Sequence, residues 1–149
     1  MTPAAPPVAE TRSTLRAWGE FLLAAPVVGL MTLLAWQVVD VVRAERLLYQ
    51  AAQAAVEEAV LPRATAATIN AAALRAVAKT RLADVMDSAI VSVNNSPVLL
   101  SPLELLQSGD RVQVTLGVYA TDVVPDVLQP LGLSLAGRKL RAESTFIKP

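Results

Sequence analysis

An uncharged, apolar run near the N-terminus constrains this chain more than any other feature. Residues 21–39 read FLLAAPVVGLMTLLAWQVV and contain no Asp, Glu, Lys or Arg. As an α-helix the run would extend roughly 28 Å, at about 1.5 Å per residue, which is close to the hydrocarbon thickness of a bilayer. Trp18 and Trp36 lie near its two ends, where an amphipathic indole ring favours the headgroup layer. The run therefore predicts a single transmembrane helix.

Two other interpretations fit this run less well. A cleaved secretory signal has a shorter apolar core, of about 7–15 residues, followed by a small-x-small cleavage site. The run here is longer, and the sequence that follows it begins Asp-Val-Val-Arg, which is no such site. A helix that is apolar on all sides can be buried in a soluble protein, but a domain this small can hardly surround it. The flanking charges do not orient the helix, because Arg12 and Arg16 on one side balance Arg43 and Arg46 on the other.

Composition excludes several classes of function. The chain has 149 residues, which suits one ordinary domain, and its formal net charge is zero, so no basic face attracts nucleic acid. It contains no His, which removes the commonest metal ligand and the commonest general base, and no Cys, which excludes disulfides and thiol chemistry. The adjacent carboxylates Glu57-Glu58 and the pair Asp84 and Asp87 are interpreted as solvated surface groups. The sequence predicts a protein that is not an enzyme, with no cofactor, no metal site and no small-molecule substrate.

Three segments follow from the pattern along the chain. Residues 1–15 contain three prolines among small and polar residues and are expected to be a disordered tail. Residues 16–62 form the transmembrane helix and its amphipathic extension, which should continue to Pro62 because no Gly or Pro interrupts residues 40–60. Residues 63–149 form a small α+β domain.

Within that domain the apolar period changes from helical to alternating. A second helix is expected over 64–86, with one shared face that comprises Leu74, Val77, Ala78, Leu82 and Val85. Strands are expected at 88–93, from Arg111 to Tyr119, and from Lys139 to Ile147, because apolar and polar residues alternate there. An apolar link with two prolines, residues 121–137, joins the last two strands. The fold class is therefore α+β, with an antiparallel sheet of about three strands.

The order of these features resembles the TadE-like family, over residues 16–147. The resemblance rests first on Glu20-Phe21 opening the apolar run, with Pro26 six residues after the Glu. It rests next on an acidic residue followed by an arginine, Asp40 and Arg43, ahead of the aromatic Tyr49 and an Ala/Gln-rich helical segment. The last parallel is Gly109-Asp110 directly before a strand. Members of this family are minor pilins or pseudopilins of the tight-adherence (Flp-type) pili of bacteria.

The resemblance implies a pilin-like fold and a structural function. It implies a single-pass protein of the bacterial inner membrane, with the C-terminal domain outside the cytoplasm. Its partners would be the membrane and other pilus subunits, or further copies of itself, contacted through the sheet edge or the apolar link. The alternative from the residues alone is an unrelated single-pass scaffold, or an accessory subunit of a membrane complex with a periplasmic binding domain.

Four residues are candidates for packing between subunits: Glu20, Phe21, Pro26 and Gly29. By resemblance, Glu20 would pair with the free N-terminal amine of a neighbouring subunit; otherwise it lies among headgroups beside Arg16. Pro26 could bend the helix or be a tolerated proline, and Gly29 could permit close helix packing or face lipid. The chain departs from the family at Leu15, where a small residue should precede the cut made by a prepilin peptidase. Processing therefore stays open, as does the role of an uncleaved assembly factor.

Overall fold

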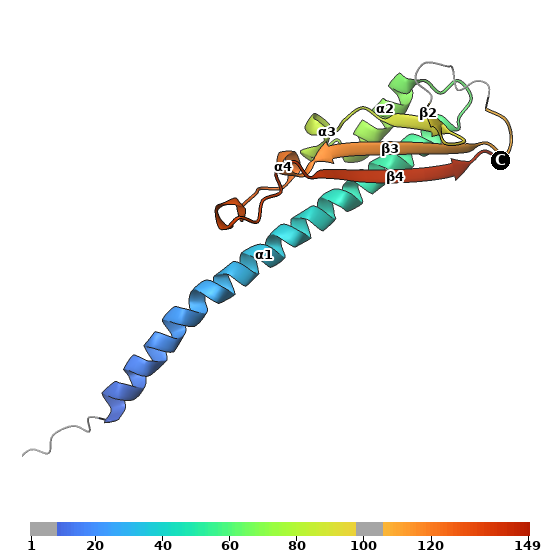
Figure 1. Cartoon of the computed structure of the whole chain (residues 1–149). Coiled ribbons are helices and arrows are strands. Elements are labelled where there is room, and N and C mark those ends of the chain that lie inside the picture. The colour runs from blue at the N-terminus through green and yellow to red at the C-terminus, as the bar shows by residue number, and fades with distance from the viewer. Residues whose placement is uncertain (1–8, 98–105) are drawn as a thin grey trace, which may run out of the picture. The chain divides into compact units, whose positions relative to one another are not determined.

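The computed structural model describes residues 9–97 and 106–149; in the first helix it describes side chains from Trp18 onward, apart from Gly19, Glu20 and Leu23. The chain divides into two units, Met1–Trp36 and Gln37–Pro149. The elements, labelled in Figure 1, follow one another in this order: helix α1 (Ala9–Ala59), helix α2 (Ala66–Val77), helix α3 (Leu82–Val85), strand β1 (Ile90–Val93), strand β2 (Ser96–Pro97), strand β3 (Arg111–Tyr119), helix α4 (Ala120–Val123), 3₁₀-helix η2 (Gln129–Leu131) and strand β4 (Lys139–Ile147).

The first unit consists of the N-terminal part of α1. The helix begins at Ala9, inside the segment 1–15 for which the sequence favoured a tail, and residues 1–8 of that segment lie outside the described part. Pro26 lies within the helix, and every residue from Ala24 to Trp36 is exposed. An apolar helix that is exposed on all sides is unfavourable in water, because exposing its whole apolar surface to water costs free energy.

From Gln37 onward the same helix buries only one face. The buried side chains recur every three or four residues, as a helix with one covered face requires, and they are Gln37, Ala44, Leu48, Ala51, Ala52, Ala55, Val56 and Ala59. Most of them are alanines, so the helix backbone can approach its neighbours closely. The helix ends at Ala59, before the predicted end at Pro62. A proline disfavours helical backbone in the residue before it, which accounts for the earlier end.

The helix expected over 64–86 is two helices, so that prediction was wrong in its extent. Helix α2 starts with a reciprocal cap, in which the Thr65 hydroxyl accepts from the Thr68 N–H and the Thr68 hydroxyl accepts from the Thr65 N–H. It ends at Val77, whose carbonyl accepts both the N–H and the hydroxyl of Thr80, at 2.9 and 2.8 Å. The predicted face was also partly wrong, since Leu74 is exposed. The buried residues of α2 are Ile69, Ala72, Ala73 and Val77.

The sheet is antiparallel and has the strand order β2-β1-β3-β4. It has four strands rather than about three, because residues 94–97 do more than turn the chain. Asn94 and Asn95 both have positive φ, 49° and 67°, as a two-residue type I′ hairpin requires, and β2 pairs back onto β1 after them. Strand β1 begins at Ile90, two residues after the predicted start. The bounds of β4 are those expected from the alternation.

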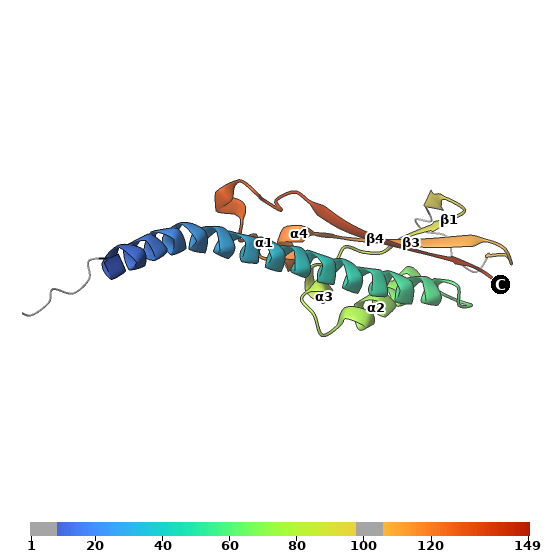
Figure 2. The same cartoon turned by 90° about the horizontal axis from the view of Figure 1, so that it is seen from below.

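One face of the sheet carries the core. The alternate residues Val112, Val114, Leu116 and Val118 of β3 are all buried, in agreement with the alternation that predicted the strand, and so are Leu140, Ala142 and Ser144 of β4. Phe146, which continues the same alternation in β4, is exposed at the end of its strand. Figure 2 shows α2 and the C-terminal part of α1 on the same side of the sheet. The second unit is therefore a two-layer α+β domain, which confirms the predicted fold class.

Candidate functional site

The four residues expected to pack between subunits all lie on the N-terminal part of α1. Glu20 is within the helix, but its side chain lies outside the described residues. Phe21 is 64% exposed and meets the Trp18 ring edge to face, with centroids 6.4 Å apart and planes at 81°. The two aromatic rings form one exposed apolar patch at the start of the uncharged run.

Pro26 and Gly29 are also exposed. A methyl group added at Gly29 would meet no atom of the described residues within 4 Å, so nothing there requires glycine for packing inside the chain. A surface free of contacts within the chain is available to lipid or to another helix. Both interpretations of Pro26 and Gly29 thus remain predictions.

Among the described residues, one helix is long and apolar enough to cross a membrane. Only 6% of its most apolar 18-residue window is buried. The core helix of a soluble protein would be mostly covered by its own domain, so the exposure of this segment argues against that alternative.

A polar cluster ties the link between α4 and β4 to the helix at Gln37. Gln37 is 6% exposed, and its Nε2 donates to Oδ1 of Asp126 at 3.5 Å. Oδ2 of Asp126 accepts from the Ser134 hydroxyl at 2.6 Å and from the Leu135 N–H at 2.9 Å. Oε1 of Gln37 is buried and has no hydrogen-bond partner in the part of the chain that is described. The cluster fixes the base of the link to α1.

The hydroxyl donated by Ser134 is the main cause of a lowered pKa at Asp126, and the Leu135 N–H and Gln37 act in the same direction. Hydrogen bonds to a carboxylate stabilise its charged form, so Asp126 stays ionised at neutral pH. Sequence reasoning missed both Gln37 and Asp126 as partners. They are 89 residues apart, and no local pattern links them.

A groove of ≈ 720 Å³ runs between the second half of α1 and β4. Its walls carry both signs of charge on each element: Glu45 and Arg46 from α1, and Arg141 and Glu143 from β4. The remaining lining residues are mostly polar and are Val42, Tyr49, Gln50, Gln53 and Ala142. Mixed charges beside exposed polar groups are typical of the rim of a protein interface.

The edge of the sheet beside this groove is open. Strand β4 is the last strand of the sheet, and β3 is its one neighbour within the described residues. One hydrogen bond lies just beyond each end of the β3–β4 pairing. The Ala120 N–H donates to the Arg138 carbonyl at 2.8 Å, and the Lys148 N–H donates to the Asp110 carbonyl at 3.0 Å. Since bonded positions alternate along an antiparallel strand, the even-numbered residues of β4 bond to β3. The odd-numbered residues, including Glu143, turn their N–H and C=O groups to the open edge.

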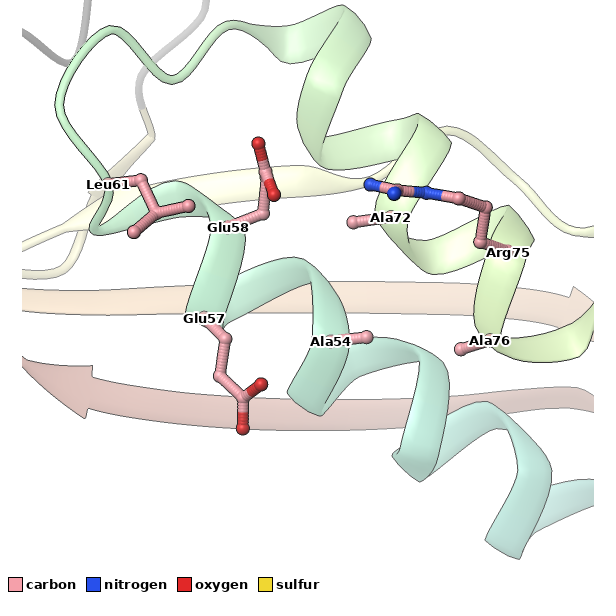
Figure 3. Close-up of a pocket in the computed structure, with 7 residues that line it drawn as sticks. All are labelled: Ala54, Glu57, Glu58, Leu61, Ala72, Arg75 and Ala76. Atoms are coloured by element: carbon pink, nitrogen blue, oxygen red, sulfur yellow. The ribbon is translucent and has the colours of Figure 1, made fainter.

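A second hollow, of ≈ 580 Å³, lies where α1 and α2 meet, and Figure 3 shows it. Arg75 extends from α2 toward the side of α1 on which Glu58 lies, whereas Glu57 points away from α2. Asp87 pairs with Lys139, and Asp84 is exposed on α3. Neither pair of carboxylates converges as a general acid and base would have to. Within residues 9–97 and 106–149, no group of three Asp or Glu side chains is placed to hold a metal ion.

Comparison of the chain with models of known protein families, with curated proteins and with solved structures found no match in any of the three.

Proposed function

We propose that this chain is a single-pass protein of the bacterial inner membrane and a non-catalytic subunit of a tight-adherence pilus, of the minor pilin or pseudopilin type. The first half of α1 spans the bilayer, and the α+β domain lies outside the cytoplasm. The observation that carries the proposal is the change along α1. The helix is apolar and exposed before Gln37, and buries only one face from there onward.

This architecture supports an anchored structural subunit. An exposed apolar helix needs either lipid or like helices around it, and a pilus bundle offers the second after the membrane offers the first. The resemblance at Glu20-Phe21 and Pro26 lies in this same segment. The domain contributes an open strand edge and a groove of mixed charge, which suit contact with a neighbouring subunit.

The variant Glu20→Gln tests the pilin-type role of the anchor. A carboxylate inside a helix bundle is unfavourable unless a cation pairs with it, so removing the charge should disrupt the register between subunits. We expect unchanged membrane insertion and a several-fold lower yield of pilus components in pull-downs from solubilised membranes, at equal expression.

Arg16→Gln is the matched control for that experiment. If the partner of Glu20 is Arg16 of the same chain, the control reproduces the loss; if the partner is a neighbour's amine, it does not. An unchanged yield for Glu20→Gln would contradict the pilin-type role and favour the alternative, an unrelated single-pass scaffold or accessory subunit. Mass spectrometry of the mature N-terminus shows separately whether the tail before Glu20 is removed.

The variant Glu143→Pro tests the open edge as the subunit contact. Proline at this position removes an N–H that faces outward, and the bonds to β3 at Ala142 and Ser144 remain. We expect loss of co-purification between two differently tagged copies of the chain. Glu143→Ala removes the same side chain but keeps the N–H, so it should retain the contact. Equal yields from the two variants, with equal melting temperatures, would show that the edge is not used.

A further inference from the structure

The link between α4 and β4 presents an apolar tip. From Val127 to Gly137 it reads VLQPLGLSLAG, and no charged residue occurs between Asp126 and Arg138. Leu131 is 58% exposed and Leu133 is 54% exposed, although both are large and apolar. Leu131 and Leu133 therefore form a small exposed apolar surface in an uncharged segment.

This tip is built by its own hydrogen bonds. Helix η2 turns the chain, and Gly132 follows it in the left-handed region, at φ 78°. The N–H groups of Gly132 and Leu133 donate back to Gln129 and Leu128, at 3.0 and 3.3 Å. The buried Leu128 packs against the domain on the N-terminal side of the tip. On its C-terminal side, Ser134 and Leu135 donate hydrogen bonds to Asp126. The exposed leucines are therefore presented in a fixed conformation, which reduces the entropy lost on binding.

The hydrogen bond between Gln37 and Asp126 places the base of the link beside Gln37 of α1. Gln37 lies two residues before the end of the uncharged run, and the first charged residue after it is Asp40. Figures 1 and 2 both show the link at the end of the sheet where α4 lies, opposite the end that leads to the C-terminus. The base of the link therefore lies where the helix would leave the hydrocarbon layer.

We propose that this link is a second membrane contact, and that Leu131 and Leu133 insert into the outer interfacial layer of the bilayer. The inference rests on the membrane anchorage in the proposed function but not on the pilus. Lipid is the occupant because the tip is uncharged and the base of its link is bonded to Gln37, near the end of the span, where Val38 and Val39 of α1 are exposed too. Arg138 follows the link and Arg43 follows Val39 in the sequence; both are exposed, although Arg43 pairs with Asp40 at 3.5 Å, and such side chains can reach lipid phosphates. In this proposal the link contacts lipid, and the β4 edge contacts the neighbouring subunits.

Such a contact would fix the orientation of the domain. A single helix leaves the domain free to tilt about the point where it emerges from the membrane. A second point of contact, made by a link that is hydrogen-bonded to the same helix, restricts that motion. The groove and the β4 edge are then held at a constant height and angle above the membrane, which would favour their contact with a neighbouring subunit.

Fluorescence quenching by lipids tests the proposal on the full chain. The protein has no cysteine, so single Cys variants can carry an environment-sensitive dye without further change. The positions are Leu133 in the tip, Leu34 in the apolar run, and Ser108, which precedes β3 at the opposite end of the sheet. Strand β3 has 9 residues, so Ser108 lies roughly 30 Å from the α4 end. Each variant is reconstituted into phosphatidylcholine and phosphatidylglycerol vesicles, with and without nitroxide-labelled lipids.

We expect blue-shifted emission and quenching at Leu34 and Leu133, and neither at Ser108. Headgroup nitroxides should quench the dye at Leu133 more than nitroxides deep in the acyl chains, and the order should reverse at Leu34. Adding Leu131→Asp to the Leu133 variant should reduce quenching without lowering the melting temperature, because both side chains are exposed.

Quenching at Leu34 without quenching at Leu133 would overturn the second contact and leave the anchor intact. Absence of quenching at Leu34 would overturn the anchor itself, and the second contact with it. A blue shift at Leu133 that increases with protein density but is insensitive to nitroxide lipids would assign the tip to another copy of the chain, and would likewise overturn the lipid contact.

Discussion

Replacing Leu30 and Leu33 together by arginine is expected to move the protein out of the membrane. Both residues are exposed near the middle of the apolar run, where each arginine opposes insertion by about 2.5–3.5 kcal/mol. The measurement is the share of full-length protein that floats with vesicles in a density gradient after carbonate washing, since flotation separates membrane-bound protein from aggregates.

The control for this prediction replaces the same two leucines by alanine. That variant changes the same positions but leaves the run uncharged, so it should float as the native chain does. If the arginine variant floats equally well, the run does not cross the bilayer, and the proposals that depend on an anchor are lost together.

The substitution Leu48→Ala is expected to destabilise the α+β domain by about 2–5 kcal/mol, because it opens a cavity under the helix. Leu48 is 0% exposed and lies in the core cluster that α1 shares with the sheet. The matched control is Leu74→Ala on α2, which makes the same chemical change at a side chain that is 40% exposed. Thermal unfolding of the detergent-solubilised chain, followed by circular dichroism, compares the two.

Leu74 is an informative control because the sequence pattern placed it on the buried face of its helix. The loss at Leu74 should be much smaller than at Leu48, within about 0.5–1 kcal/mol of the native chain. Losses of equal size would show that the face of α2 is wrongly assigned.

Sequence reasoning succeeded where one physical signal dominated. The apolar run and the strict alternation in β3 and β4 predicted the long helix and the two longest strands, because each leaves a regular pattern in the sequence. It failed where short-range hydrogen bonds decided the outcome. Thr80 ends α2 by bonding back to Val77, and the pair Asn94-Asn95 closes a hairpin onto β2, a strand that was not among those expected.

The polar cluster at Gln37 was beyond prediction for a different reason. Gln37 is one polar residue in an apolar run, and Asp126 is one acidic residue in an apolar link, so neither stands out. Their meeting depends on the complete sheet, which brings the α4 end beside the helix. The exposed leucines of the tip were visible as an apolar link, but their exposure became known only from the fold.

The alanine face of α1 has a consequence for the order in which the protein is made. This face is synthesised early, whereas β4, which completes the sheet beside it, comes last among the elements. The contact between Gln37 and Asp126 spans 89 residues, so this part of the core closes only after the link to β4 has been synthesised. Alanine exposes little apolar surface, so this part of α1 should aggregate less before the sheet has been translated. Alanine also has the highest helix propensity, which favours the helix before the sheet packs on it. Larger residues on that face would pack as a core but would expose more apolar surface on the helix until the sheet is complete.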